Sequence, residues 1–320
     1  MPEVTCVGIL VADVVGKPVD QMPERGKLSL VERMELRPGG CAANTALGLS
    51  KLGIDTAIVG KVGTDGFGDF MVQCFAQQGI ATDGIARDTE TATSATMVMV
   101  HGDGERSFIH YLGANATFRF EDIVYDKLRR SKILHVAGSL VMPAFDGEPT
   151  AQLLKQAQRD GMVTALDTVW DAQGRWMNAL APALPYVDYF LPSYEEARML
   201  AGGLDNPADV AKFLIDAGVK VVGLKMGERG CYVRTADGAK FRVPVMNIQA
   251  IDALGAGDAY VAGFLAGLVK DWDIETCARF ATAVGASCVQ SLGATTGIKT
   301  FGETLQILGG VAQPVHDTTA

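Results

Sequence analysis

The 320-residue sequence is poor in the residue patterns that build metal clusters and disulfide frameworks. Its six cysteines form no C-x-x-C pair, and its four histidines, His101, His110, His135 and His316, have no metal-ligand spacing. Each cysteine lies in an apolar or helix-like context, which favours free, buried thiols in a reducing compartment. The sequence therefore argues against a disulfide-stapled domain or a zinc module.

Long apolar runs and basic stretches are also absent. The longest apolar run, residues 259–269, falls well short of the ~20 residues that span a bilayer. The first 15 residues lack a basic segment and carry Asp13 inside an apolar run, so we predict no signal peptide. A formal charge of −9 argues against nucleic acid and anionic membranes as partners, although a local pocket can still be positive. We expect a cytoplasmic protein.

Four widespread catalytic motifs are missing. The sequence contains no G-x-x-x-x-G-K-[ST], no G-x-G-x-x-G after a first strand, no H-R-D and no G-x-S-x-G. Their absence argues against four classes of enzyme: P-loop nucleotide hydrolases, dinucleotide oxidoreductases, protein kinases and α/β-hydrolases.

Short β-rich runs alternate with helical patterns over most of the chain. The runs are rich in β-branched residues and bounded by turn formers, which predicts buried strands at 4–10, 56–62, 132–138, 162–168, 187–192 and 220–226. The helix candidates at 149–161 and 207–218 each have proline in the first turn and glycine at the end. This order predicts an α/β fold with a mostly parallel central sheet flanked by helices.

Two stretches, residues 16–38 and 91–112, alternate polar and apolar residues with no helix between them. The second contains Asp103-Gly104, a hairpin turn signal, between two apolar runs. We predict that they form a small β-sheet lid, inserted into a main domain of residues 1–15, 39–90 and 113–310. One face of such a sheet needs a cover, so the lid should close over a ligand, a partner subunit or both. Residues 311–320 are expected to be a flexible tail.

The stretch AIDALGAGDAY, residues 250–260, places Gly255, Ala256 and Gly257 before Asp258 at the start of an apolar helix. Glycine leaves backbone amides uncovered, and a helix start attracts anions. A carboxylate at such a site suits the deprotonation of a hydroxyl next to a phosphate. The alternative is a helix-capping carboxylate, worth ~1 kcal/mol, but Asp252 adds a second carboxylate that capping does not require.

Three further motifs are each ambiguous alone. Gly39 and Gly40 lead into a small-residue helix with Asn44, which indicates either a packing turn or a site for ligand hydroxyls. Ser193 and Glu196 in FLPSYEEARML fit a capping box, or place a carboxylate near magnesium and phosphate. The stretch LKMGERGCYV, residues 224–233, predicts a tight turn between strands that could also let a nucleotide approach.

Taken together, GGCAANTALGLSKLG and IDALGAGDAYVAGF resemble the two signatures of the ribokinase-like (PfkB) carbohydrate kinases. They lie ~210 residues apart on an alternating α/β chain, and the resemblance runs from about residue 4 to residue 300. It implies a ribokinase-like fold and transfer of the γ-phosphoryl group of ATP to a hydroxyl of a sugar or sugar derivative, with Mg²⁺.

The resemblance also implies a role for each matching residue. Asp258 resembles the general base, and the amides of Gly255, Ala256 and Gly257 resemble the anion hole. The positions that match sugar contacts are Asp13, Gly39, Gly40, Asn44, Arg106 and Asn115. Those that match ATP contacts are Ser193, Lys225, Gly227, Gly230 and Gly293. Glu196 matches a glutamate that holds Mg²⁺ through water, and Asp252 is a candidate for a monovalent cation, K⁺.

This chain departs from the family pattern at two of these places. Ala253 follows Asp252 where the family has threonine, and Ser193 stands where the family has the asparagine of an N-x-x-E motif. Neither change removes the base or the anion hole. A nucleoside kinase and a non-catalytic sugar-binding regulator remain alternatives, and the exposed face of the lid suggests a homodimer.

Overall fold

The structure, a computed structural model, describes residues 1–246 and 248–309 and the backbone of 315–316. A ten-stranded sheet forms its centre, in the order β14-β13-β12-β11-β10-β9-β8-β1-β4-β5. The seven strands from β11 to β5 pair in parallel, and β12 to β14 add antiparallel strands at one edge. The bounds are β1 (Val4–Gly8), β4 (Thr56–Gly63), β5 (Ala81–Asp88), β8 (Ile133–Ser139), β9 (Val163–Thr168), β10 (Tyr189–Phe190), β11 (Val221–Lys225), β12 (Cys231–Thr235), β13 (Lys240–Val243) and β14 (Val315–His316).

Helices cover both faces of this sheet, and each face has its own apolar cluster. One cluster includes side chains of α1 (Cys41–Lys51), α2 (Gly66–Gln77), α9 (Ala256–Val269), α10 (Ile274–Cys288) and α11 (Phe301–Leu308). The other includes α4 (Tyr125–Leu128), α5 (Glu148–Arg159), α6 (Met177–Leu180), α7 (Tyr194–Leu200) and α8 (Pro207–Asp216). Short turns of helix complete the chain at α3 (Ala114–Thr117), η1 (Phe120–Asp122), η2 (Leu184–Tyr186) and η3 (Gly227–Arg229). None of the described helices is long and apolar enough to span a membrane.

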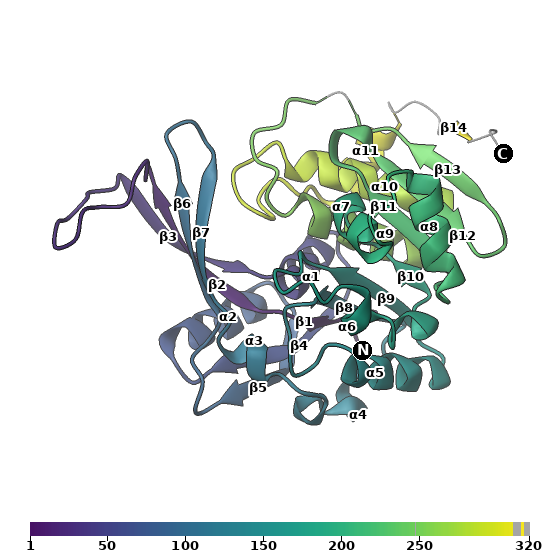
Figure 1. Cartoon of the computed structure of the whole chain (residues 1–320), viewed down its shortest axis with the longest axis horizontal. Coiled ribbons are helices and arrows are strands. Elements are labelled where there is room, and N and C mark those ends of the chain that lie inside the picture. Colours follow the sequence, from purple (N-terminus) through teal and green to yellow (C-terminus); the bar gives the residue numbers. More distant parts are fainter. Residues whose placement is uncertain (247, 310–314, 317–320) are drawn as a thin grey trace.

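A second sheet projects from the main domain as the predicted lid, drawn in purple and blue in Figure 1. Its order is β3-β2-β6-β7, with bounds β2 (Val11–Lys17), β3 (Arg33–Gly39), β6 (Ala95–Val100) and β7 (Arg106–Tyr111). The predicted boundary between residues 15 and 16 falls inside β2, because the chain enters the lid directly after β1. The β6–β7 hairpin turns at Asp103-Gly104, as the sequence indicated.

The predicted strands and helices of the main domain are confirmed. Each of the six buried runs contains a strand, and the two proline-started helices are α5 and α8. Strand β5 was not predicted, because its exposed and half-buried residues lack an apolar run. All six cysteines are free, and four of them are buried. The predicted flexible tail, 311–320, lies outside the described residues except for the backbone of β14.

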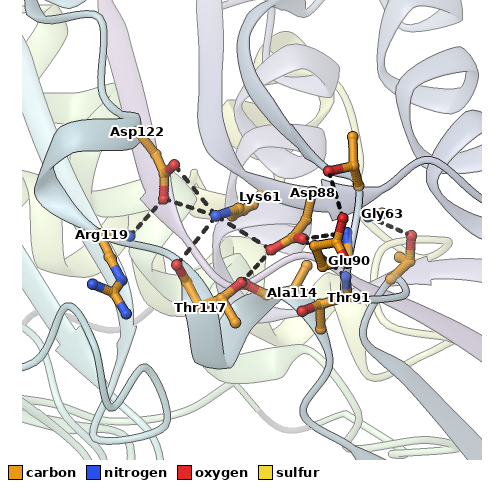
Figure 2. Close-up of polar contacts among 11 residues, drawn as sticks. Lys61, Gly63, Asp88, Glu90, Thr91, Ala114, Thr117, Arg119 and Asp122 are labelled. Atoms are coloured by element: carbon orange, nitrogen blue, oxygen red, sulfur yellow. Dashed lines mark hydrogen bonds and ion pairs between the residues drawn. The ribbon is translucent and has the colours of Figure 1, made fainter.

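Both ends of the β6–β7 hairpin are tied to the main sheet by a polar network around Lys61, shown in Figure 2. The Lys61 ammonium lies 3.3 Å from Asp88 and 3.2 Å from Asp122, and it donates to the carbonyl of Thr117. Asp88 also accepts hydrogen bonds from the Thr117 hydroxyl and from the amides of Glu90 and Thr91. Because residues 89–94 precede β6 and α3 follows β7, this network fixes where the hairpin leaves the main domain.

Candidate active site

The start of α9 is open and uncapped. Its N-cap is Gly255, in the left-handed region at φ 74°, and no side chain caps the helix. Among the described residues, the amides of Gly257 and Asp258 make no hydrogen bond, whereas the Ala256 amide donates to the carbonyl of Ala253 over 3.3 Å. The first turn of α9 therefore presents free N–H groups and the positive end of a helix dipole. The capping alternative for Asp258 does not describe this helix.

Asp258 lies in this first turn and points toward α1. Its Oδ2 accepts a hydrogen bond from Asn44 Nδ2 at 2.9 Å, across 214 residues of sequence. Burial raises the pKa of Asp258, while the Lys225 ammonium and the hydrogen bonds from Asn44 and Cys41 lower it in part. The other amide atom of Asn44, Oδ1, is buried without a partner among the described residues, so it remains available to a ligand hydroxyl.

A lysine and two further carboxylates lie close to Asp258. Lys225, at the end of β11, places its ammonium 2.7 Å from Asp167 at the end of β9. Burial works against the charged form, but the carboxylates of Asp167 and Glu196 raise the pKa of Lys225, so it stays protonated. A Cβ added to Gly257 would lie 3.4 Å from the Lys225 ammonium, which places this cation directly beside the free amides of α9.

The predicted capping box at the start of α7 is present, and it also orients Glu196. The Ser193 hydroxyl accepts from the Glu196 amide, and the Ser193 amide donates to Glu196 Oε2 at 3.1 Å. The same Oε2 accepts from the hydroxyl of Thr168 at 3.1 Å. Ser193 thus acts here as a cap, while Glu196 adds negative charge beside Lys225 and Asp167.

Asp13, on the inner face of β2, lies against the backbone of Gly39. A Cβ at Gly39 would overlap the Asp13 carboxylate, and one at Gly40, where φ is 93°, would overlap the Ile9 carbonyl. Only glycine fits these two positions at the start of α1. Burial raises the pKa of Asp13 to about 6, although a hydrogen bond from Thr96 acts in the opposite direction and lowers it.

Arg106 and Gly293 meet at Asp252. The Arg106 guanidinium, from lid strand β7, lies 2.5 Å from Asp252 Oδ2, which also accepts from the Gly293 amide at 2.6 Å. The Leu254 amide donates to Oδ1. Hydrogen-bond donors of the protein thus occupy both oxygens of Asp252, the carboxylate that the resemblance offered as a K⁺ ligand.

Asn115, one of the predicted sugar contacts, lies in α3 directly after the lid. It is buried, and its side-chain amide accepts from the Leu10 amide at 3.1 Å and donates to the Leu10 carbonyl at 3.0 Å. Both polar atoms therefore hold the turn between β1 and β2, which makes Asn115 a positioning residue for the strand that carries Asp13.

Two cavities lie on opposite sides of the loop before α9. The lid cavity, about 80 Å³, is lined by Asp13, Val15, Lys17, Arg33, Glu35, Arg37, Pro38, Val98, Val100, Arg106, Asp252, Leu254, Leu292, Gly293 and Ala294. The main-domain cavity, about 740 Å³, is lined by Lys225, Met226, Gly227, Glu228, Gly230, Val245, Met246, Ile248, Ala250, Ala253, Ala256, Gly257, Tyr260, Thr282, Gly285, Ala286 and Val289. Of the predicted turn glycines, Gly227 begins η3 and Gly230 follows its end, and both line the second cavity.

Sequence reasoning missed Asp167, Lys17 and Arg37 as site residues. Asp167 is the penultimate residue of a buried parallel strand, and a carboxylate at such a strand end is a usable signal. Lys17 and Arg37 stand in the alternating lid segments, where only the strand register shows which face they occupy.

An open helix start, a buried carboxylate and a lysine lie together next to the loop that borders both cavities, an arrangement that suits the transfer of an anionic group. The chain matches the model of the pfkB family carbohydrate kinases over residues 1–300 and belongs to that family. Carbohydrate kinases are phosphotransferases with an alcohol group as acceptor, and this chain is one of them.

Several known proteins are similar over nearly their whole length. An uncharacterized sugar kinase of Archaeoglobus fulgidus is 30% identical over 252 residues, which cover 79% of this chain and 98% of that protein. Probable fructokinase-5 of Arabidopsis thaliana is 30% identical over 302 residues, covering 88% and 92%. The solved structure of a fructokinase with bound ATP from Xylella fastidiosa is 28% identical and matches with a TM-score of 0.82 over 97% of this chain and 99% of that one.

Proposed function

We propose that this kinase transfers the γ-phosphoryl group of ATP to a hydroxyl of a sugar or sugar derivative bound in the lid cavity. The main-domain cavity takes the nucleotide, because glycines and apolar side chains line it and Lys225 stands at its phosphate end. The loop of residues 252–257 separates the two cavities, so the phosphoryl group passes in front of the α9 N-terminus.

The observation that carries this proposal is the position of Asp258 in the first turn of α9. The hydrogen bond from Asn44 orients its carboxylate as a general base for the acceptor hydroxyl. The free amides of Gly257 and Asp258 lie in the same turn of α9. There they would stabilise the negative charge that develops as the hydroxyl is deprotonated and the phosphoryl group is transferred. Phosphoryl transfer asks the protein mainly for such alignment and charge stabilisation.

The donor set near Lys225 fits a magnesium ion held with phosphate oxygens. Asp167 and Glu196 would supply hard oxygen ligands, and Mg²⁺ retains several waters in most protein sites. In the described residues, no group of three or more His, Cys, Asp or Glu side chains could hold a metal ion. We propose that Glu196 acts largely through water, the role that the family resemblance implies. Asp252 is not proposed to bind K⁺, because the Arg106 guanidinium already neutralises that carboxylate.

The test is ADP release with ATP and Mg²⁺ across a panel of sugars, nucleosides and sugar acids, comparing the native chain with Asp258→Asn. Loss of the base should lower kcat by at least ~10²-fold. The substitution keeps the size and one acceptor oxygen of the side chain, so the fold should be unaffected. Equal turnover by the two proteins would overturn the assignment of the base.

We also propose that the outer face of the lid joins two copies of the chain. Leu36, Val14, Met97 and Ile109 form a continuous apolar row across all four lid strands. Met97 and Ile109 are each about half exposed, at 50% and 51%. A contiguous apolar face of this kind on a projecting sheet fits a second copy, which can cover it with the same row.

Light scattering on the purified chain tests this association. The native chain should be a dimer, and Ile109→Glu should be a monomer, because the carboxylate would be buried in the interface. Val124→Glu, at a residue 54% exposed on the main domain, is the control and should remain dimeric. A monomeric native chain at micromolar concentration would rule the interface out.

A further inference from the structure

The lid cavity is locally positive on a chain whose formal charge is −9. Four cations, Lys17, Arg33, Arg37 and Arg106, line it together with three carboxylates, which leaves a formal excess of one positive charge. The main-domain cavity, in contrast, has one cation and one carboxylate in its lining. An excess of cations at the acceptor end of the site is not needed to bind a neutral sugar.

The strand register places these cations on one face of the lid. Lys17 is directly opposite Arg33, and Arg106 is directly opposite Val100, which lines the same cavity. Arg37 is opposite Asp13, four residues nearer the main domain. The inner face thus carries cations at both ends of a groove whose base end holds Asp13.

The carboxylates of the cavity do not neutralise all of these cations. Glu35 is shared, because Arg33 and Arg37 both pair with it. Asp252 divides its oxygens among Arg106 and two backbone amides. The Lys17 ammonium has no ion-pair or hydrogen-bond partner in the part of the chain that the structure describes.

Two guanidinium groups also converge from opposite edges of the lid. Arg37 from β3 lies against Gly293, where an added Cβ would overlap its Nη1. Arg106 from β7 shares Asp252 with the Gly293 amide. Two converging guanidinium groups in a cavity that an ammonium also lines favour a carboxylate or phosphate, because each cation can donate charge-assisted hydrogen bonds.

We propose that the acceptor carries an anionic group, a carboxylate or a phosphate, and that Lys17 and Arg37 bind it. This inference rests on the proposed kinase function and narrows its substrate class. The hydroxyl that receives the phosphoryl group lies toward Asp13 and the loop before α9, which both border the lid cavity. The anionic group faces the cations of the lid.

The test compares acceptors in matched pairs. Initial rates with ATP and Mg²⁺ are measured for aldonates, uronates and sugar monophosphates, each beside its neutral parent sugar. At least one anionic member should exceed its parent in kcat/KM by about 10-fold or more, the effect of one or more charge-assisted hydrogen bonds. Whether sugar acids or sugar phosphates are preferred identifies the anion.

Lys17→Met is the informative variant, because Lys17 has no ion pair to break. It should raise KM for the anionic acceptor about 10-fold, with kcat little changed, and raise KM for the neutral parent sugar by clearly less. Lys27→Met removes a lid cation that does not line the cavity and is the matched control. Arg106→Gln is unsuitable, since it would also unpair Asp252.

The outcomes separate the two proposals. Transfer to neutral sugars with equal or higher efficiency, unchanged in Lys17→Met, would overturn the anionic acceptor and leave the kinase function intact. Transfer to no acceptor of the panel, under conditions where the protein is folded, would overturn both.

Discussion

The two cavities on either side of the loop before α9 are built from different chemistry. The main-domain cavity is lined mostly by glycine, alanine and larger apolar side chains, with Lys225 and Glu228 as its charged members. The lid cavity has seven charged residues in its lining, and most of them come from lid strands. A nucleotide has a large flat base that apolar contacts can hold, whereas a small hydroxylated acceptor must be oriented by polar groups.

The loop itself takes part in both cavities. Asp252 and Leu254 face the lid cavity, while Ala253, Ala256 and Gly257 face the main-domain cavity. A change in this loop should therefore affect both substrates, whereas a change elsewhere should affect one of them. Each of the following predictions uses that distinction.

Among changes that leave Asp258 in place, the largest effect is expected from Gly255→Ala. At φ 74°, a Cβ would overlap the carbonyl and Cα of Ala294, so the loop and its neighbour must both move. A shift of about 1 Å at such a site can cost about 10²-fold in kcat, and KM for both substrates should rise. Gly53→Ala has the same φ with nothing within 4 Å and isolates the backbone strain. Steady-state kinetics that match this control would show that the loop tolerates the displacement.

Lys61→Met should act on the lid cavity alone. The change leaves Asp88 and Asp122 without their shared cation, and the Lys61 and Asp88 side chains are only 12% and 10% exposed. Urea denaturation should show that the free energy of unfolding falls by about 3 kcal/mol. KM for the acceptor should rise, because the hairpin loses its anchor (Figure 2), while KM for ATP stays unchanged.

Lys132→Met is the control for this prediction. It breaks a surface pair with Glu3 in which the lysine is 60% exposed, and it should cost less than about 1 kcal/mol. An equal loss of stability in the two variants would mean that the Lys61 network contributes no more than a surface ion pair.

Much of this architecture follows from local sequence patterns. Short apolar runs between turn formers determine the parallel strands, and Asp103-Gly104 determines the lid hairpin, because both depend on neighbouring residues only. The boundary of the lid could not be predicted from such local patterns. Val11–Lys17 continues the apolar pattern of Val4–Gly8, so nothing local marks where the chain passes from one sheet to the other.

The site residues also divide into those that the local sequence predicts and those that depend on the tertiary structure. Asp258 and its glycines are contiguous, and a helix start gives them a physical meaning without a structure. The pairing of Asp167 with Lys225 spans 58 residues and depends on which strands are neighbours. Asn115 resembled a sugar contact, but its amide holds Leu10, a role that only the tertiary structure can reveal.

Gly285→Leu should act on the main-domain cavity alone. Gly285 lies within α10 and lines this cavity, and an added Cβ would meet the Ala256 carbonyl at 3.4 Å, an ordinary contact. The larger side chain should fill nucleotide space and raise KM for ATP by about 10-fold, as overpacking by one side chain would. Gly302→Leu, in α11 with open space around it, gives the same gain in helix propensity without entering a cavity. A rise in KM for the acceptor instead would show that the cavities are assigned the wrong way round.

The smallest effect concerns the acid limb of the pH profile. Burial raises the pKa of Asp258, so this carboxylate is protonated at a higher pH than an ordinary aspartate. A base must be deprotonated, and kcat/KM should therefore fall as the pH decreases through that raised pKa. Asn44→Ala removes a hydrogen bond that favours the charged form, so the pKa should rise further and the limb should move to higher pH.

Asp13 is the competing origin of this limb, because burial raises its pKa to about 6. In Asp13→Asn, the limb should persist if Asp258 causes it, although kcat/KM is lower at every pH. A limb that disappears in Asp13→Asn and does not move in Asn44→Ala would assign the titration to the lid. The pH dependence would then report acceptor binding by the lid cavity, not proton abstraction at the start of α9.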